Sequence, residues 1–197
     1  YWQTEDGRTF VREAPRANDP RTPAQSEQRA NFQAAVALYK NLSPEEQRAW
    51  RDWAAFVEAS RGGRRRGRAN SAYLALALTY MRLHPGQWPP STPPASLFLG
   101  DHVAVTAAAA GQGVAFTSDR PNSPGVATLL LLQRLRSVGE RPRAGHDRIA
   151  GVHTFVPGGL SVTVPARPGE YECSVRLAEV ATGQTTGLVR VGRVRVG

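Results

Sequence analysis

The sequence predicts an α+β protein with a helical N-terminal half and an all-β C-terminal half. The hydrophobic period is close to 3.6 residues in the first half and changes to about 2 from Ser96 onward. Five prolines lie between residues 85 and 94, and such a stretch is typical of a semi-rigid extended linker. We therefore expect three parts: a β-hairpin with a three-helix module in residues 1–84, a proline-rich linker in 85–95, and a seven-stranded β-sandwich in 96–197.

The first twelve residues predict a β-hairpin. Asp6-Gly7 suits a two-residue turn, because both residues tolerate positive φ. This turn pairs Glu5 with Arg8 and places Trp2 and Phe10 on opposite faces of the ribbon. An isolated two-stranded hairpin is marginally stable in water, so it must contact its own helices or a neighbouring subunit. The side chains expected at a subunit contact are Tyr1, Trp2 and Phe10.

Two similar start signals predict a pair of helices joined as an αα-hairpin. Thr22-Pro23-Ala24-Gln25 and Ser43-Pro44-Glu45-Glu46 both place a capping hydroxyl three residues before Gln or Glu, with Pro in the first turn. The second helix carries Trp50 and Trp53 at helical spacing. Aromatic side chains at this spacing are typical of a helical core, and the alternative is a surface that stacks on nucleic-acid bases.

An arginine-rich loop follows the second helix. Residues 61–68 contain five arginines and three glycines. The arginine charges repel one another, and a segment of this composition cannot pack a core. Either this is a simple connector or it lies on phosphates or an acidic protein surface. Asn70 is then expected to cap a third helix that stops at His84.

Seven segments of alternating apolar residues predict the strands of the second half. Turns rich in Gly, Pro or Asn separate them, and about seven short strands in about 100 residues indicate a β-sandwich. The predicted strands are 102–109, 113–118, 126–135, 149–156, 160–164, 170–180 and 187–196.

Gly169-Glu170-Tyr171-Glu172-Cys173 resembles a motif of the immunoglobulin-like and fibronectin type III group. Tyr171 precedes Cys173 by two residues at the start of the penultimate strand, where that group places a corner-forming tyrosine. The resemblance covers residues 96–197 and implies an immunoglobulin-like sandwich. The chain has one cysteine and no tryptophan in 126–135, so an antibody-type domain is excluded.

The last strand breaks strict alternation. A bulge at Gly192 restores the phase and turns the arginines outward. It places Val189, Val191, Val194 and Val196 inward and Arg190, Arg193 and Arg195 outward. Charge on a terminal strand discourages edge pairing, and the alternative is a docking row for acidic groups.

The N-terminal half is similar to uncharacterised bacterial and prophage-type proteins. The similarity rests on residues 18–25, Asn-Asp-Pro-Arg-Thr-Pro-Ala-Gln, together with Gln28, Arg29 and Phe32. Such proteins begin with a short hairpin, continue through a helix start of this kind and end in an immunoglobulin-like domain. The resemblance implies a role in an assembly or at a surface and transfers no catalytic residue.

Arginine dominates the charge of the chain. The formal net charge is +9, and 24 of the 25 basic residues are arginine. Arginine stays charged near neutral pH, and its planar guanidinium forms paired hydrogen bonds to carboxylates and phosphates. The alternative explanation is nucleotide bias, because a GC-rich genome encodes arginine frequently. The charge is +5 in residues 1–95 and +4 in 96–197, so neither half is a dedicated cationic module.

No catalytic constellation is apparent in the sequence. Cys173 is the single cysteine and lies in a predicted core strand, which excludes an internal disulfide and a cysteine-based zinc site. The four histidines, at positions 84, 102, 146 and 153, have no helical metal-ligand spacing. We therefore expect neither an enzyme nor a cofactor or metal site.

The leading hypothesis is a non-enzymatic structural subunit of a repeating viral or cell-surface assembly, such as a filament or a shell. Its partners are copies of itself and other assembly proteins. One alternative is nucleic-acid binding through Arg61–Arg68, a less favoured partner. The other is adhesive ligand binding by the loops 119–125 and 139–151. The candidate interface or polyanion-binding residues are Arg61, Arg64, Arg65, Arg66, Arg68, Arg190, Arg193 and Arg195.

This hypothesis predicts an extracellular or virion location. No apolar run approaches the roughly 20 residues that span a bilayer. The chain begins at Tyr1 without a methionine, as expected for a processed or truncated product.

Overall fold

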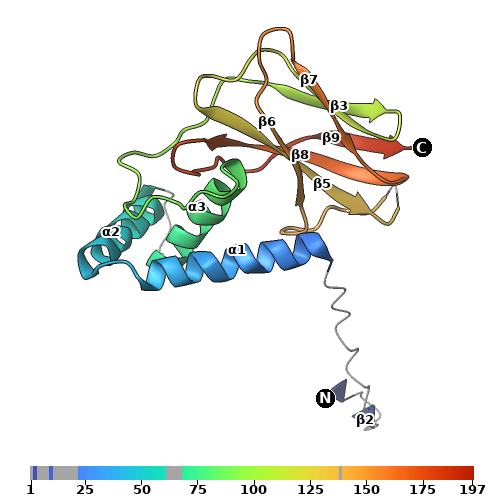
Figure 1. Cartoon of the computed structure of the whole chain (residues 1–197). Coiled ribbons are helices and arrows are strands. Elements are labelled where there is room, and N and C mark those ends of the chain that lie inside the picture. The colour runs from blue at the N-terminus through green and yellow to red at the C-terminus, as the bar shows by residue number, and fades with distance from the viewer. Residues whose placement is uncertain (1, 4–8, 11–21, 61–67, 138) are drawn as a thin grey trace. The chain divides into compact units, whose positions relative to one another are not determined.

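The computed structural model describes residues 2–3, 9–10, 22–60, 68–137 and 139–197 (Figure 1). The chain forms two compact units, Tyr1–Ala30 and Asn31–Gly197. The architecture is α+β, as predicted: the described residues form three helices, a short ribbon, and seven strands in two antiparallel sheets. The predicted domain boundaries at residues 84 and 96 stay a prediction, since both lie inside the second unit.

The N-terminal ribbon consists of β1 (Trp2–Gln3) and β2 (Thr9–Phe10). The two strands are antiparallel, with Trp2 opposite Phe10 and Gln3 opposite Thr9. The predicted pairing of the two strands is confirmed, but the predicted register is wrong by one residue. A two-residue turn at Asp6-Gly7 requires an even number of residues between paired positions, whereas seven residues separate Trp2 from Phe10. The predicted placement of Trp2 and Phe10 on opposite faces of the ribbon followed from that register and is wrong, because the two residues pair directly.

Both predicted capping boxes are confirmed in α1 (Pro23–Lys40) and α2 (Pro44–Ser60). The Gln25 amide donates to Thr22 Oγ1 at 3.3 Å, and the Thr22 amide donates to Gln25 Oε1 at 3.2 Å. Ser43 and Glu46 exchange the same two bonds at 3.2 and 2.8 Å. Each box satisfies backbone donors that a helix start leaves without partners, which fixes where the helix begins.

The third helix, α3 (Ala69–Leu83), ends at His84 as predicted but does not begin at Asn70. Arg68 takes the N-cap position with an extended backbone and no side-chain cap. Asn70 is already in the first turn, and its Oδ1 accepts a hydrogen bond from Ser71 Oγ at 3.4 Å. The predicted Asn70 cap is therefore wrong.

Aromatic side chains form the core of the helical part. Trp50 and Tyr73 make an edge-to-face pair with ring centroids 5.0 Å apart, and the ring centroids of Tyr39 and Tyr73 are 5.4 Å apart. Trp50 is 2% exposed and Trp53 is 7% exposed, so the prediction that they are core residues is confirmed. Neither indole is accessible for stacking on a base.

The seven remaining strands form a three-stranded and a four-stranded antiparallel sheet (Figure 1). The first has the order β3-β4-β7 and the second β6-β5-β8-β9. The strands in chain order are β3 (Val105–Ala110), β4 (Gly113–Ser118), β5 (Val126–Leu135), β6 (Arg148–His153), β7 (Ser161–Pro165), β8 (Gly169–Glu179) and β9 (Val189–Val196).

The two sheets share one core. Phe116 and Val164 of the three-stranded sheet belong to the same buried cluster as Leu130, Cys173 and Val194 of the four-stranded sheet. The opposite face of β5 is buried as well, where Leu129 and Leu131 pack with Leu83 at the end of α3. This second contact explains why β5 is apolar on both faces, whereas a half-solvated strand alternates.

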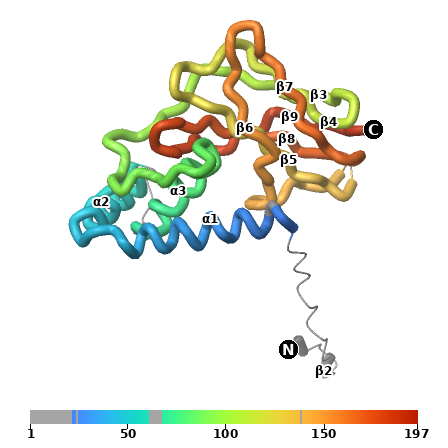
Figure 2. The backbone as a smooth tube through the Cα atoms, in the orientation of Figure 1, coloured from blue at the N-terminus to red at the C-terminus, as the bar shows by residue number. Residues whose placement is uncertain are grey.

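The proline-rich segment packs against the helices instead of bridging solvent. Figure 2 shows the chain after α3 turning back alongside the helices before it enters β3. The Trp50 indole Nε1 donates to the Ser91 carbonyl at 2.6 Å. Hydrogen bonds from the Ser91 side chain and then from Ser43 hold the pKa of Glu46 below its usual value. The segment is thus tied to both the core and the start of α2.

A glycine joins the helical part to the four-stranded sheet. Gly183, in the turn between β8 and β9, has φ of +76°, and a Cβ there would lie 2.5 Å from the Leu76 carbonyl oxygen and 2.8 Å from the Tyr80 amide nitrogen. His84 Nε2 hydrogen-bonds the Val180 carbonyl at 2.8 Å beside this contact. Only glycine allows the two backbones to approach this closely.

We expect Gly183→Ala to lower the free energy of unfolding by about 3 kcal/mol, because it combines a positive-φ strain with a backbone clash. Gly187→Ala is the matched control, since a Cβ at Gly187 meets no atom within 4 Å. Urea denaturation of both variants measures the difference. Equal stability of the two variants would contradict the packing described.

Candidate interaction surface

The terminal strand β9 carries the predicted bulge. Gly192, with φ of +146°, pairs with Cys173, and Arg190 pairs with Ser174, so Val191 is the extra residue. The bulge restores the phase of the strand as predicted. It leaves Val194 and Val196 buried in the core and Val191 partly buried against it.

Val189 departs from the predicted burial of the inward valines. It lies opposite Val175, on the side that an inward residue faces, but it remains 56% exposed. Val189 is the first residue of β9, and β9 is an edge strand of its sheet. An edge position at the start of a strand has neighbours on fewer sides, so correct facing does not bring burial there.

Carboxylates on β8 hold the outward arginines of β9 in place. Glu172 Oε2 accepts a hydrogen bond from Arg193 Nε at 3.0 Å, and Glu172 Oε1 lies 3.6 Å from Arg190 Nε. Glu170 Oε1 lies 3.6 Å from Arg195 Nε. The sequence indicated the arginines but not these partners, although the register of the two strands places Glu170 opposite Arg195 and Glu172 opposite Arg193.

The arginines remain largely in solvent even though their partners do not. The side chains of Arg190 and Arg195 are 57% and 80% exposed, whereas that of Glu172 is 7% exposed. Arg193, which hydrogen-bonds Glu172, is 44% exposed. The carboxylates on β8 thus hold arginine side chains that remain partly or largely accessible to solvent. Arg190 and Arg193 pair with Glu172, and Arg195 pairs with Glu170. We call Arg190, Arg193 and Arg195 the arginine row.

The other predicted interface residues are not brought to this row. Arg61, Arg64, Arg65 and Arg66 lie outside the described residues, as does Tyr1. Arg68 is exposed at the start of α3. Trp2 and Phe10 are described only as the backbone of the β1–β2 ribbon, so their expected subunit contact stays a prediction.

The sheet core encloses the single cysteine. Cys173 is 0% exposed, and burial, with a smaller contribution from the Glu172 charge, raises the pKa of its thiol to about 12. The thiolate is the reactive form of cysteine, so the folded environment suppresses its nucleophilicity. Within the described ranges, no group of three or more His, Cys, Asp or Glu side chains could hold a metal ion.

We expect Cys173 in the folded protein to resist an aromatic disulfide reagent at mildly alkaline pH, while the same protein in guanidinium reacts completely. Absorbance of the released aromatic thiolate is the measurement: it should not rise in native buffer and should rise by one equivalent when guanidinium is added. Stoichiometric labelling of the folded chain would contradict both the burial and the raised pKa.

The loop before β5, one of the proposed recognition loops, is held by an aspartate. Asp101 accepts hydrogen bonds from the Ser123 amide at 2.7 Å, the Ser123 hydroxyl at 2.8 Å and the His102 amide at 2.8 Å. Partial burial raises the pKa of Asp101, but the bonds from Ser123 and His102 outweigh it and hold the pKa below its usual value.

A depressed pKa stabilises the fold above the ordinary pKa of aspartate, and this contribution is lost as the pH falls through the lowered value. We therefore expect wild-type stability to decrease on acidification, and the decrease to be smaller in Asp101→Asn. At neutral pH, that variant should lose about 1 kcal/mol after allowance for solvent screening. Denaturation curves across the acidic range, with the exposed Asp52→Asn as control, test this. Identical pH profiles for Asp101→Asn and wild type would exclude it.

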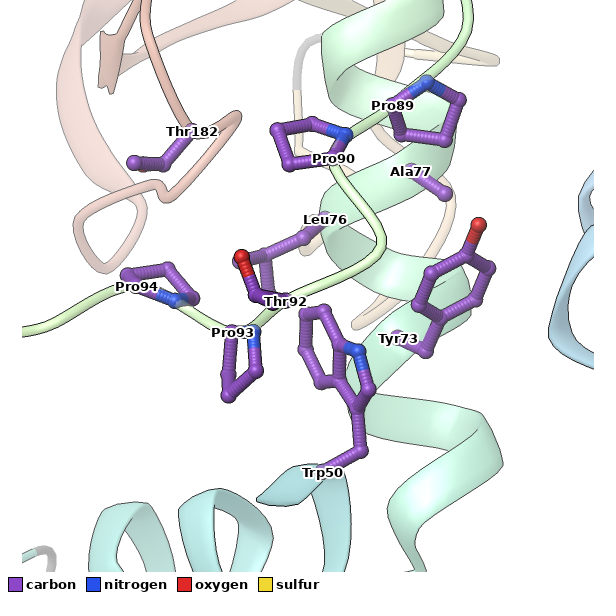
Figure 3. A pocket seen from close by; sticks show the side chains of 10 residues that line it. All are labelled: Trp50, Tyr73, Leu76, Ala77, Pro89, Pro90, Thr92, Pro93, Pro94 and Thr182. Atoms are coloured by element: carbon purple, nitrogen blue, oxygen red, sulfur yellow. The ribbon is translucent and has the colours of Figure 1, made fainter. Parts of the chain in front are cut away.

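A pocket lies where the proline-rich segment, α2, α3 and the β8–β9 turn meet (Figure 3). Its volume is about 140 Å³. The walls are mainly apolar and consist of Trp50, Tyr73, Leu76, Ala77, Pro89, Pro90, Thr92, Pro93, Pro94 and Thr182. The prolines, which the sequence indicates as a linker, instead form part of the pocket wall. No local pattern in the sequence predicts this pocket, because Trp50 and Ser91 are 41 positions apart.

Comparison with known proteins finds no family model and no curated protein that matches this chain. The surface therefore has to be interpreted from its own residues. In the described part of the chain, no helix is both long enough and apolar enough to cross a bilayer.

Proposed function

We propose that this protein is a non-enzymatic structural subunit of a repeating viral or cell-surface assembly, and that residues 96–197 form an immunoglobulin-like domain within it. An extracellular or virion location is part of the proposal. The observation that carries the function is the arginine row: an edge strand presents exposed arginine side chains that pair with the buried Glu172 and the partly buried Glu170.

Two features support the immunoglobulin-like interpretation. The strands divide three and four, and the pairing of β4 with β7 and of β5 with β8 requires the chain to cross between sheets. The Tyr171 hydroxyl also donates to the Arg167 carbonyl at 2.9 Å, four residues upstream. This is the bond that a tyrosine corner makes in such domains.

The row suits a partner that offers carboxylates. Arg193 is already held by a hydrogen bond through its Nε, so it loses less side-chain entropy on binding a partner than a free surface arginine would. Arg190 and Arg195 lie within ion-pair distance of a carboxylate on β8. Arginine forms two parallel hydrogen bonds to one carboxylate, which adds direction to the attraction. Glu45, exposed in the first turn of α2, is an example of a carboxylate that a second copy presents.

The nucleic-acid alternative has less support among the described residues. It required Trp50 or Trp53 to stack on bases, and both side chains are buried in the helical core. The adhesive alternative has no specific observation in its favour, since Asp101 ties down one of its loops for a structural reason.

The test is the oligomeric state of the full chain, measured by size-exclusion chromatography with light scattering over a range of protein concentrations and salt. We expect self-association at low salt that weakens as salt is added, because exposed charges are screened. The double variant Arg190→Gln with Arg195→Gln should raise the dissociation constant by about tenfold, because it removes two surface ion pairs of ordinary strength.

Arg120→Gln with Arg143→Gln is the matched control. These two arginines are 62% and 54% exposed, and each is paired with a nearby carboxylate on a loop. The control removes the same charge without touching β9 and should associate like wild type. A wild-type chain that stays monomeric up to high concentration, at both low and moderate salt, overturns the proposal. Equal losses in both double variants would assign the effect to net charge.

A further inference from the structure

Leu99 projects almost entirely into solvent. Its exposed fraction is 91%, the highest among the large apolar side chains described. Single exposed leucines are common on protein surfaces, so exposure alone carries no inference. What distinguishes Leu99 is that the backbone on both sides of it is held firmly.

The neighbours of Leu99 are each anchored to a different part of the second unit. Leu97 packs against the helical core, and the Phe98 amide donates to Gln184 Oε1 at 3.1 Å. Gly100, with φ of +102°, lies so close to Thr186 that a Cβ would come within 2.9 Å of its methyl group. Leu99 is therefore a fixed apolar projection, and its position is set before any partner arrives.

The pocket between the prolines and α3 offers a complementary hollow. The indole of Trp50 and the ring of Tyr73 lie at one side, and the prolines of the segment lie opposite (Figure 3). The Trp50 N–H is already bonded to Ser91, and the Thr182 hydroxyl to Glu179. These two polar groups are thus satisfied within the chain, so the pocket favours an apolar group over a polar one.

The volume of the pocket matches a leucine side chain. An apolar cavity of about 150 Å³ accepts benzene, which has six carbons. A pocket of about 140 Å³ therefore admits the four-carbon side chain of leucine. Trp88 is also exposed, at 64%, but its indole is larger than benzene. Among the described apolar side chains, Leu99 combines the greatest exposure with a size that fits.

We propose that Leu99 of one copy inserts into the Trp50–Tyr73–proline pocket of a second copy. The proposal rests on the assembly function above and names a contact for it. The projection and the hollow are made of different residues, so every copy carries one of each, and the contact joins unlike surfaces of identical subunits. It is apolar, in contrast to the arginine row, so the two contacts respond differently to salt.

Two variants separate the halves of this contact. Leu99→Ala removes the projection and leaves the pocket, whereas Thr92→Phe places a ring in the pocket and leaves the projection. Thr92 is exposed at the pocket wall, so both changes should preserve the thermal unfolding curve. Should Thr92→Phe fail to fold, Leu99→Gln and Leu99→Ala still test the projection. Val189→Ala is the matched control, since Val189 is another exposed aliphatic residue.

Sedimentation velocity of the full chain at about 0.5 M NaCl isolates the apolar contact, because the Debye length is then only a few ångströms. We expect wild type and Val189→Ala to associate, and each of the two contact variants to do so about ten- to a hundredfold more weakly, as loss of one buried leucine predicts. An equimolar mixture of Leu99→Ala and Thr92→Phe should form a one-to-one heterodimer, since one intact projection then meets one intact pocket.

The other outcomes are decisive as well. Association of Leu99→Ala and Thr92→Phe at wild-type strength overturns the leucine contact and leaves the assembly function standing. Wild-type association at low salt that vanishes at about 0.5 M NaCl also overturns it, in favour of the arginine row alone. A mixture that stays monomeric, although wild type associates, excludes the proposed pairing of projection and pocket. A wild-type monomer at every salt concentration overturns both proposals.

Discussion

The turn between β8 and β9 packs its backbone directly against the backbone of α3, because Gly183 has no side chain to keep them apart. This contact positions the pocket wall, the chain around Leu97 and the start of β9. Thr182 lines the pocket, and Gln184 donates to the Ser96 carbonyl and accepts from the Phe98 amide, which fixes the chain on either side of Leu97. The same turn leads into β9, so the arginine row also depends on it. A close backbone approach thus sets the geometry of three separate features.

The arginine row shows how burial changes the meaning of a charge. Exposed ion pairs contribute little to stability, because solvent screens them and both side chains lose entropy. Glu172, however, is nearly buried on β8 and needs a cation, so Arg193 and Arg190 are recruited to it. The carboxylate satisfies its own requirement and, in doing so, orders two guanidiniums at the edge of the sheet. Two of the outward arginines of β9 are therefore held in place because the buried carboxylate of Glu172 on β8 requires positively charged partners.

Local signals in the sequence were the most reliable. Both capping boxes begin their helices at the predicted proline, and two strands, Gly113–Ser118 and Val126–Leu135, have the predicted bounds. These features depend on neighbours within a few residues. The packing of the proline-rich segment on Trp50 depends on residues 41 positions apart, and no local pattern encodes it. The hairpin register was predicted from the turn alone and is wrong by one residue, and such a shift moves every side chain to the other face. Glu172 was missed as an anchor because its burial requires the assembled sheet.

The two proposed contacts differ in the physics that would hold them, and the difference has a structural consequence. Charged rows attract over several ångströms and tolerate small misalignment, so they bring copies together without fixing an angle. A leucine in an apolar pocket gains energy only when its shape fits, so it fixes the angle but acts at contact range. In an assembly of the proposed kind, the arginine row supplies encounter and the leucine contact supplies geometry. Because Phe98, the neighbour of Leu99, and Thr182 at the pocket wall both hydrogen-bond Gln184, the relation between projection and hollow is set inside each subunit. Successive copies would then repeat one rotation, which is the requirement for a regular ring or filament.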